Sequence, residues 1–465
     1  MHTTAQDAKA IASKPSSKGY KRWLIFLLLL TYASNFMDRI IVATVGQAIK
    51  LDLGLSDLQL GLLGGMAFAF FYAALGIPLA RLSERYSRVK IIAGCVALWS
   101  VMTTMCGFAQ NYMQLLLMRI GVGIGEAGGT PASHSIIADE FPANRRATAF
   151  AIYALGVPIG ALAGAILGGW IVQNFGWREA FLYLGIPGVI LALLVLFTLR
   201  EPVRGAAEGM SKADQGEIPT LKVVLRLLAS KKTFIHMTFG CALIGFANFG
   251  INMFMPIYFT RVFGMNFAQA GLIFGLIAGI GALIGNSMGG ILADWAGKRD
   301  PRWYLWVIAL GVAVATPFYM LAFIQTNWMV AASMMLVFGC VMYSWYGSTF
   351  AVAYTLVQPR MRASVSAIIL LVNTLLGQGL GPVFMGYVSD KFTARSFDGG
   401  VYSAFCAKGA PIQEAGSDIA VACAQAAATG IRYAAVVSAA VFLWGAFHYY
   451  WASRTLEQDK EKIAS

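Results

Sequence analysis

Charged side chains are scarce in this chain. Only 12% of its 465 residues are Asp, Glu, Lys or Arg, whereas 58% are hydrophobic. A soluble domain carries about 25% charged residues, so this chain lacks the polar surface that a water-soluble body of its size needs. The apolar residues instead form continuous runs of about 20 residues, the length at which an α-helix crosses a bilayer. Because the runs do not alternate with polar residues, we expect helices rather than the strands of a barrel.

Motifs for ATP-driven or enzymatic chemistry are also missing. Gly297-Lys298 lacks the glycine five residues earlier that a P-loop requires, so we do not expect an ATP-driven pump. No Cys/His spacing indicates a zinc site, and no nucleophile stands with a base. The four histidines are far apart in the sequence: His2, His134, His236 and His448. We therefore expect no enzyme, no metal and no cofactor.

The net charge of +13 does not indicate nucleic-acid binding, because the basic residues are not gathered on one face or tail. Most Lys and Arg residues lie in the two tails and in every second loop. By the positive-inside rule, this places both termini in the cytoplasm of a protein of the plasma or inner membrane. Residues 1–20 are polar, and the long run that follows is expected to stay as a membrane helix rather than to be cleaved as a signal.

The apolar runs predict an all-α membrane protein with twelve spans: 22–49, 57–80, 90–109, 112–139, 147–173, 180–200, 234–262, 267–293, 303–324, 329–356, 364–390 and 429–453. They form two pseudo-symmetric six-helix bundles, 22–200 and 233–454, flanked by the tails 1–21 and 455–465. The linker 201–232 ends in apolar residues at helical spacing, from Leu221 to Leu228. This pattern predicts an amphipathic helix at the inner membrane interface, and an extension of the seventh span is the alternative.

The two halves carry an internal repeat. Residues 80–90 after the second span and 290–299 after the eighth both place an acid four residues after a small residue, with basic residues behind it. A Pro with an Arg three residues later follows both the fourth and the tenth span. Spans five and eleven are both rich in glycine. Six spans repeated in one orientation is the layout of some transporters.

The repeated loops resemble the loop signature of the major facilitator superfamily, although Glu84 stands where Asp is usual. The resemblance covers essentially the whole chain and implies a transporter that places its glycine-rich fifth and eighth spans against each other. A narrower likeness lies in two segments. Residues 35–39 and 119–127 are similar to segments of the spinster family of lysolipid and sphingolipid-phosphate transporters, which implies that class of substrate.

Four ionisable residues lie inside the apolar spans: Asp38, Arg39, Arg119 and Glu126. A charge at mid-bilayer costs roughly 2.5–3.5 kcal/mol on insertion scales, so these residues need partners or a water-filled cavity. We expect Arg39 and Arg119 to line a cavity and attract an anionic headgroup. Glu126 would exchange the coupling proton while Asp38 orients an arginine. A permanent structural network of ion pairs is the alternative.

Spans seven to eleven contain no clear acid or base, so the second half is expected to supply an apolar and aromatic wall for a greasy tail. Its predicted substrate-binding residues are Asn248, Asn252, Tyr343, Trp345, Tyr346 and Asn373. Packing between helices is the alternative role for each of them.

Loop charges are expected to lock the cytoplasmic side in the outward-open state: Glu84, Arg85, Arg88, Asp139, Glu140, Arg145, Asp294, Lys298 and Arg299. Cys406 and Cys423 share the longest polar loop, where a disulfide is plausible if that loop faces an oxidising compartment.

The function predicted from these residues and the resemblance is proton-linked transport of an anionic amphiphile by a monomer, through alternating access. Membrane lipids surround such a protein, and nucleic acid is not expected as a partner. A transporter of a small organic acid or a hydrophobic drug is one alternative. A non-transporting sensor or scaffold on the same fold is another, although the intact pair of Arg39 and Glu126 argues against it.

Overall fold

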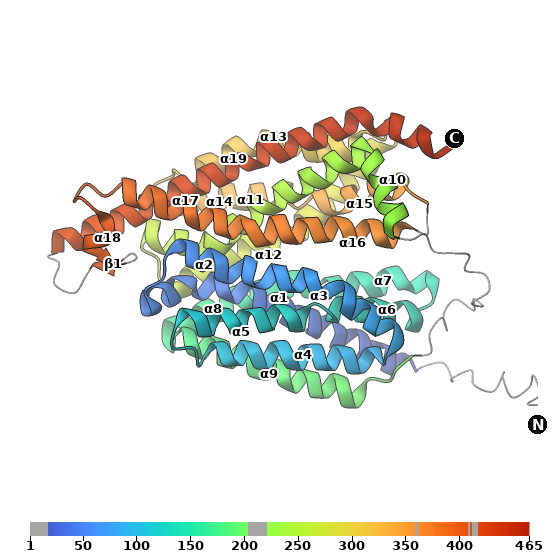
Figure 1. The fold of residues 1–465 in the computed structure, drawn as a ribbon, viewed down its shortest axis with the longest axis horizontal. Helices are drawn as coiled ribbons and strands as arrows, with labels where there is room; N and C mark the ends of the chain where they lie inside the picture. Colours follow the sequence, from blue (N-terminus) through green and yellow to red (C-terminus); the bar gives the residue numbers. More distant parts are fainter. Residues whose placement is uncertain (1–16, 203–220, 359–360, 408–409, 412–416, 465) are drawn as a thin grey trace, which may run out of the picture.

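The computed structural model of the chain describes residues 17–202, 221–358, 361–407, 410–411 and 417–464. These residues form long helices that run back and forth along one axis (Figure 1). The strands among them are β1 (Cys406–Ala407) and β2 (Ala410–Pro411), which pair as a small antiparallel hairpin.

The first half is a bundle whose helices are α1 (Lys18–Leu53), α2 (Asp57–Gly64), α3 (Met66–Arg85), α4 (Arg88–Cys106), α5 (Tyr112–Glu126), α6 (Gly129–Glu140), α7 (Ala143–Ala154), α8 (Gly156–Asn174) and α9 (Trp177–Thr198). The second half contains α10 (Leu221–Ser230), α11 (Lys232–Phe263), α12 (Phe267–Gly297), α13 (Trp303–Ala322), α14 (Trp328–Met342), α15 (Trp345–Thr355), α16 (Arg362–Val372), the π-helical segment η3 (Asn373–Leu380), α17 (Gly381–Arg395), α18 (Tyr402–Phe405) and α19 (Ser417–Ala464).

The predicted twelve passes are present, and several of them consist of more than one segment. Eleven stretches of the described residues are long and apolar enough to cross a membrane. The remaining pass is α5 with α6, which are separated at Ala127 and Gly128 and run beside α4. Figure 1 shows the two halves as two layers, with α1–α9 below and α10–α19 above.

One predicted boundary is wrong. The last helix begins at Ser417 rather than 429, because the alanine-rich residues 420–428 are strong helix formers despite their modest hydropathy. Cys423 therefore lies in α19 and not in a loop. At the linker, a helix is present where the sequence predicts one: α10 is separated from α11 by the extended backbone of Lys231 and is not an extension of the seventh span. Residues 203–220 of the predicted linker lie outside the described residues.

Small residues bring the two halves close together. A Cβ on Gly271 of α12 would lie 2.4 Å from the carbonyl oxygen of Ala165 in α8, and one on Gly61 of α2 would lie 2.2 Å from that of Pro382 in α17. The expected contact between the fifth and eighth spans is thus present. The stripe of α8 that contains Gly160 does not take part in it, since that stripe faces Ala33 and its neighbours on α1.

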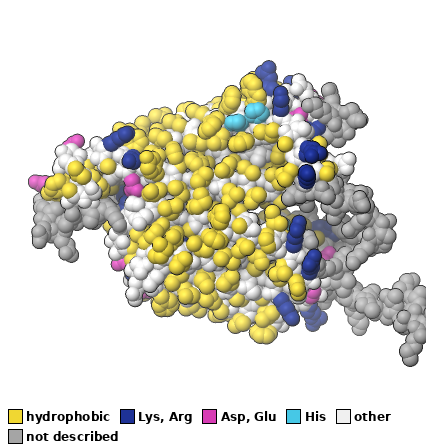
Figure 2. All heavy atoms as spheres, in the orientation of Figure 1, with side chains coloured by type: hydrophobic (Ala, Val, Ile, Leu, Met, Phe, Trp, Pro, Cys, Tyr) yellow, Lys and Arg dark blue, Asp and Glu magenta, His cyan; other side chains and the backbone are white. Residues whose placement is uncertain are grey.

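The two ends of the bundle differ in charge. We call the end with Lys18, α10 and Ala464 the termini end, and the end with Leu53, α2 and the hairpin the disulfide end. Figure 2 shows a broad hydrophobic surface between them, with Lys and Arg side chains gathered at the termini end. A surface of this kind suits a bilayer, with the basic residues at one of its faces.

Candidate functional site

An ion pair between α1 and α5 lies at the centre of the first half. Nε of Arg39 donates to Oε2 of Glu126 at 2.8 Å. Glu126 is the last residue of α5, and its side chain is fully buried, whereas 17% of the Arg39 side chain is exposed. The pair can therefore be reached from the arginine and not from the carboxylate.

Aromatic rings surround the guanidinium of Arg39. Its central carbon lies 5.2 Å from the ring centre of Phe36, 4.9 Å from that of Phe68 and 4.7 Å from that of Tyr72. Such contacts stabilise a cation by roughly 0.5–2 kcal/mol each. They hold the guanidinium in one orientation and form a site that suits a group with both negative charge and apolar surface.

Arg119 lies deeper than Arg39. Only 1% of it is exposed, and its Nη1 donates to the backbone oxygen of Asp38 at 3.4 Å. The carboxylate of Asp38 is also buried, within electrostatic range of Arg119 and Glu126. This differs from the expectation that both arginines line the cavity. The reason is that Arg119 points toward α1, where the buried charges balance one another.

The buried charges are not fully satisfied by hydrogen bonds. Among the described residues, Nε of Arg119 has no hydrogen-bond partner, and Oε1 of Glu126 has none within 3.5 Å, although the side chain of Asn35 lies nearby. Buried polar atoms of this kind are uncommon in folded proteins and point to water, to a proton or to a second arrangement of the network. The arrangement is therefore better suited to change than a closed set of structural pairs would be.

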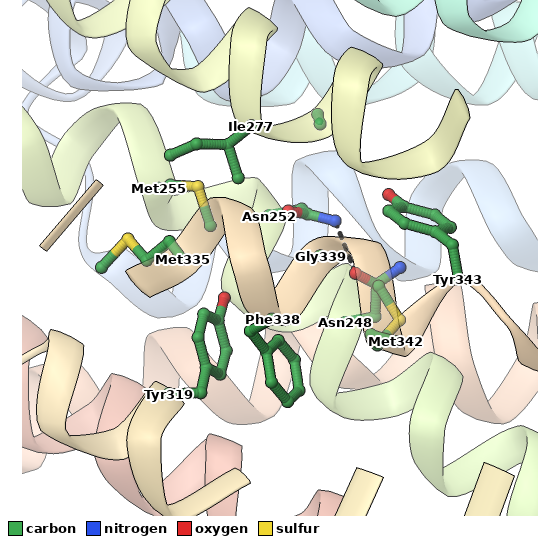
Figure 3. Close-up of a pocket in the computed structure, with 11 residues that line it drawn as sticks. Asn248, Asn252, Met255, Ile277, Tyr319, Met335, Phe338, Gly339, Met342 and Tyr343 are labelled. Carbon is green, nitrogen blue, oxygen red and sulfur yellow. Dashed lines mark hydrogen bonds between the residues drawn. The ribbon is translucent and has the colours of Figure 1, made fainter. Parts of the chain in front are cut away.

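The second half contributes a small polar cluster, which Figure 3 shows. Nδ2 of Asn252 donates to Oδ1 of Asn248 at 2.7 Å, and Tyr343 lies beside both amides. The cavity at this cluster is otherwise lined by apolar and aromatic side chains, including those of Met255 and Phe338. Three of the predicted substrate-binding residues are thus brought together.

The other three lie apart from that cluster. Tyr346 is 49% exposed and lies within electrostatic range of Tyr72, so it faces the first half near the rings around Arg39. Trp345 is packed into the core of the second half. Asn373 is buried between η3 and α11, where its Oδ1 lies against Gly245.

A second ion cluster, which the sequence analysis missed, joins the two halves at the disulfide end. The carboxylate of Asp57 accepts hydrogen bonds from Lys50 Nζ at 2.6 Å and from Ser389 Oγ at 2.7 Å. Both Nη groups of Arg261 also donate to it, at 2.7 and 2.8 Å. Lys50 and Asp57 belong to the first half, whereas Arg261 and Ser389 belong to the second. We call these four residues with Asp390 the interhalf lock.

Asp390 completes the lock through the backbone. Its carboxylate accepts from the N–H groups of Asp57 and Leu58 at 3.0 and 2.9 Å, so an acid of the second half caps the first turn of α2. Tyr402 of α18 lies within electrostatic range of Arg261 and Asp390. Burial raises the pKa of its phenol to about 12, although the nearby Arg261 opposes that shift.

The disulfide end is also fastened covalently. Cys406 and Cys423 form a disulfide with their Cα atoms 5.8 Å apart, which ties β1 to α19. A small apolar cluster with Phe397 and Ala426 surrounds it. The hairpin that follows α18 is thereby held close to the lock.

At the termini end, by contrast, ion pairs between described residues stay within one half. Arg88 is buried and pairs with Asp139 and, at 2.7 Å, with Glu201. Partial burial raises the pKa of the Glu201 carboxyl, but hydrogen bonds from Arg88, Val89 and Ser87 outweigh it, and the pKa lies below its ordinary value. Sequence reasoning placed Glu201 in the linker and missed it.

Apart from Glu84, the other predicted gate residues form no ion pair across the halves with another residue that the structure describes. Nζ of Lys21 lies 3.8 Å from Glu140. Asp294 accepts from the hydroxyl of Tyr304 at 2.9 Å. The exposed ones are Arg85, Arg145, Lys298 and Arg299, and the side chain of Glu84 lies outside the described residues. Ion pairs and hydrogen bonds therefore join the two halves at the disulfide end, whereas at the termini end the ion pairs between described residues stay within one half.

Comparison with known proteins gives one consistent family. Residues 28–382 match the family model of the Major Facilitator Superfamily. An MFS-type efflux pump of Mycolicibacterium smegmatis is 34% identical, over 79% of this chain and 84% of its own length. Protein spinster homolog 1 of Xenopus laevis is 30% identical, over 80% of this chain and 74% of its own length.

Solved structures agree with this. A bacterial homologue of the human lysosomal transporter spinster, in an inward-facing and unoccupied conformation, is 33% identical with a TM-score of 0.88 and covers 96% of this chain and 99% of its own. The inward-facing and occupied conformation has a TM-score of 0.85.

Proposed function

This chain belongs to the major facilitator superfamily and resembles the spinster proteins in it, so it is a membrane transporter and not an enzyme. We propose that it moves an anionic amphiphile and that a proton is the coupling ion. The observation that carries this proposal is the pair of Arg39 and Glu126, which is accessible only at the arginine and is enclosed by aromatic rings. The likeness to spinster proteins supports a transporter of this family.

The chemistry of the site follows from its geometry. The guanidinium is the group that an anionic headgroup would reach, because a planar fork of N–H donors suits carboxylate and phosphate oxygens. The partly exposed rings of Phe36 and Tyr72 would lie against the first carbons of the apolar chain, and Tyr346 of the second half would close over them. The polar cluster of Asn248, Asn252 and Tyr343 would receive neutral groups of the substrate.

The proton would act by changing the partner of Arg39. A proton that binds at Oε1 of Glu126, the oxygen without a hydrogen-bond partner within 3.5 Å, removes the negative charge that holds Nε of Arg39. The guanidinium is then free to pair with the anion of the substrate. Loss of the proton restores the ion pair and displaces the substrate, so proton and substrate movements become linked.

We also propose the orientation of the protein. The gathering of Lys and Arg at the termini end supports a cytoplasmic location of that end in a plasma or inner membrane. With that orientation, the fastened disulfide end is the outer end, and the conformation is inward-facing. The predicted gate residues, from Glu84 to Arg299, would meet across the halves only after the interhalf lock opens. The chain would work as a monomer.

The test is flux of a labelled lysolipid phosphate in proteoliposomes under an imposed pH gradient. We expect gradient-driven accumulation by the wild type, and loss of the response to the gradient in Glu126→Gln with exchange of substrate retained. Asp52→Asn is the matched control, because Asp52 is an acid of α1 in an exposed pair with Arg178 at 2.7 Å. It should accumulate substrate like the wild type.

Accumulation by Glu126→Gln at the wild-type rate would disprove the role of the proton site. Absence of lysolipid flux in every variant would disprove the substrate class. Flux of a hydrophobic drug would then be measured, because the relative at 34% identity is named an efflux pump.

A further inference from the structure

Two histidines that are distant in the sequence meet on the outer surface of the second half. Nδ1 of His236 in α11 lies 3.0 Å from Nδ1 of His448 in α19, and the ring centres are 5.1 Å apart. Both rings are partly exposed. Figure 2 shows histidine side chains, in cyan, at the edge of the hydrophobic surface beside Lys and Arg side chains of the termini end. They lie within one half, apart from the lock and from the ion pair of the first half.

The facing nitrogens define what can bind there. An imidazole Nδ1 either carries a proton or offers a lone pair, so the contact requires one donor and one acceptor. When both rings are neutral and carry their proton on Nε2, the two Nδ1 lone pairs point into the same space. On a tetrahedral ion with metal–nitrogen bonds of about 2.0–2.1 Å, two imidazole nitrogens would stand roughly 3.3 Å apart. The observed separation differs from this by only a few tenths of an ångström.

The surroundings favour a cation that forms bonds with nitrogen. Trp451 lies 6.3 Å from the ring of His236, and Phe239 and Phe447 lie about the ring of His448 at 6.0 and 5.8 Å. Lys232, one turn before His236, is the charged group within electrostatic range of the pair. A hard cation such as Mg²⁺ or Ca²⁺ prefers oxygen ligands, whereas imidazole suits zinc, copper and nickel ions.

We propose that His236 and His448 form an open binding site for one divalent transition-metal ion, which ties α11 to α19. The described residues contain no group of three or more His, Cys, Asp or Glu side chains that could hold a metal, so water completes the coordination. A site with two protein ligands is weaker than a structural zinc site and exchanges its ion readily. Because both rings are partly exposed, the ion would remain in contact with water. The expectation of no metal followed from the distance between the histidines along the sequence, and the packing of α11 on α19 removes that distance.

The site is tested on the purified full-length protein by thermal unfolding with and without Zn²⁺ after treatment with a chelator. We expect Zn²⁺ to raise the Tm by about 2 °C or more and the chelator to reverse the rise, because an ion that binds only the folded state stabilises it. The rise should vanish in His236→Asn and in His448→Asn and should persist in the control His134→Asn.

Because each variant is compared with itself in the absence of metal, a lower starting Tm does not affect the result. A second measurement is electron paramagnetic resonance of added Cu²⁺, which should show one ion per chain with coupling to two nitrogens. Equal Zn²⁺ shifts in the wild type and both histidine variants, or a copper spectrum without nitrogen coupling, would overturn the proposal.

Discussion

Asp57→Asn is the sharpest perturbation of the interhalf lock. The substitution keeps the shape of the side chain and removes the charge that holds Lys50 and Arg261, whose side chains are only 5% and 7% exposed. Removal of one partner of a buried ion pair costs about 3–5 kcal/mol. We take the lower bound of about 3 kcal/mol, because the amide oxygen can still accept a hydrogen bond.

The loss of free energy in Asp57→Asn destabilises only the conformation in which the lock is formed. The lock exists while the two halves meet at the disulfide end, and its members reach water when that end opens. At 1.4 kcal/mol for each factor of ten, a loss of about 3 kcal/mol shifts the equilibrium toward the other conformation by about a hundredfold. An ensemble dominated by the fastened state should therefore become a mixture or reverse its populations.

Distances between two spin labels measure this shift. Phe108 of the first half and Val401 of the second are 66% and 67% exposed near the disulfide end, so labels at these positions should not disturb the packing. The four free cysteines would be replaced first. We expect a longer distance to gain population in Asp57→Asn than in the wild type, measured by double electron–electron resonance.

A double variant distinguishes the electrostatic explanation from a packing defect. Asp57→Asn with Lys50→Met removes one charge of each sign and leaves Arg261 with Asp390, so the double variant should return part of the way to the wild-type distribution. An unchanged distance in Asp57→Asn would refute the assignment of this cluster as a lock. Equal behaviour of the single and double variants would refute the charge argument.

Three further predictions concern other parts of the molecule. Arg39→Lys keeps the charge but loses the planar face and the fork of donors, so the KM for an anionic substrate should rise at least about tenfold; an unchanged KM would mean that the substrate binds elsewhere. Replacement of both Cys406 and Cys423 by Ser opens a crosslink across a sequence separation of 17 residues, which should lower stability by about 3 kcal/mol, seen as a lower Tm; an unchanged Tm would mean that the hairpin melts independently. Glu201→Gln should lower the Tm at neutral pH, because the pKa of this carboxyl is lower in the folded state than in the unfolded state. The contribution of Glu201 to stability is therefore complete above the unfolded-state pKa and is lost as the pH falls through the folded-state pKa. The difference in Tm from the wild type should shrink below about pH 4.5, and a difference that is constant with pH would contradict this reasoning.

The passes were predictable because hydropathy is a local property. A run of apolar residues needs no distant partner to be recognised, and the cost of a charge in a membrane marked Arg39 and Glu126 in the same way. The hydrogen bond between these two residues joins positions 87 apart, and no spacing in the sequence predicted it. The buried position of Arg119 could not be predicted from the sequence, because the neighbouring helices decide which face of a helix points to the cavity.

The lock and the histidine pair could not be predicted for the opposite reason. Asp57 and Arg261 stand at the ends of spans, where charges are ordinary and carry no local signal. Asp57 and Arg261 are 204 residues apart in the sequence, and the two histidines are 212 residues apart. Only the packing of the two halves, and of α11 on α19, brings such residues together. At Gly61, a Cβ would lie 2.2 Å from a backbone oxygen of α17, which shows how closely the two halves approach there.

Helix α1 contains both the partner of the proposed proton site and one member of the lock. Arg39 and Lys50 are both in α1, with Gln47 between them accepting from Nε of Arg261 at 2.8 Å. Eleven residues of helix span about 16 Å, a distance over which α1 can move as a rigid element. A change of partner at Arg39 frees α1 from α5 at one point, while the lock binds α1 to the second half at another. Alternating access then requires no separate signal between the two sites, since any tilt of α1 that follows release of Arg39 also displaces Gln47 and Lys50 from their partners. Such coupling is a property of one helix and two sets of contacts, and it distinguishes this arrangement from a permanent structural network, in which Arg39 and the lock would break independently.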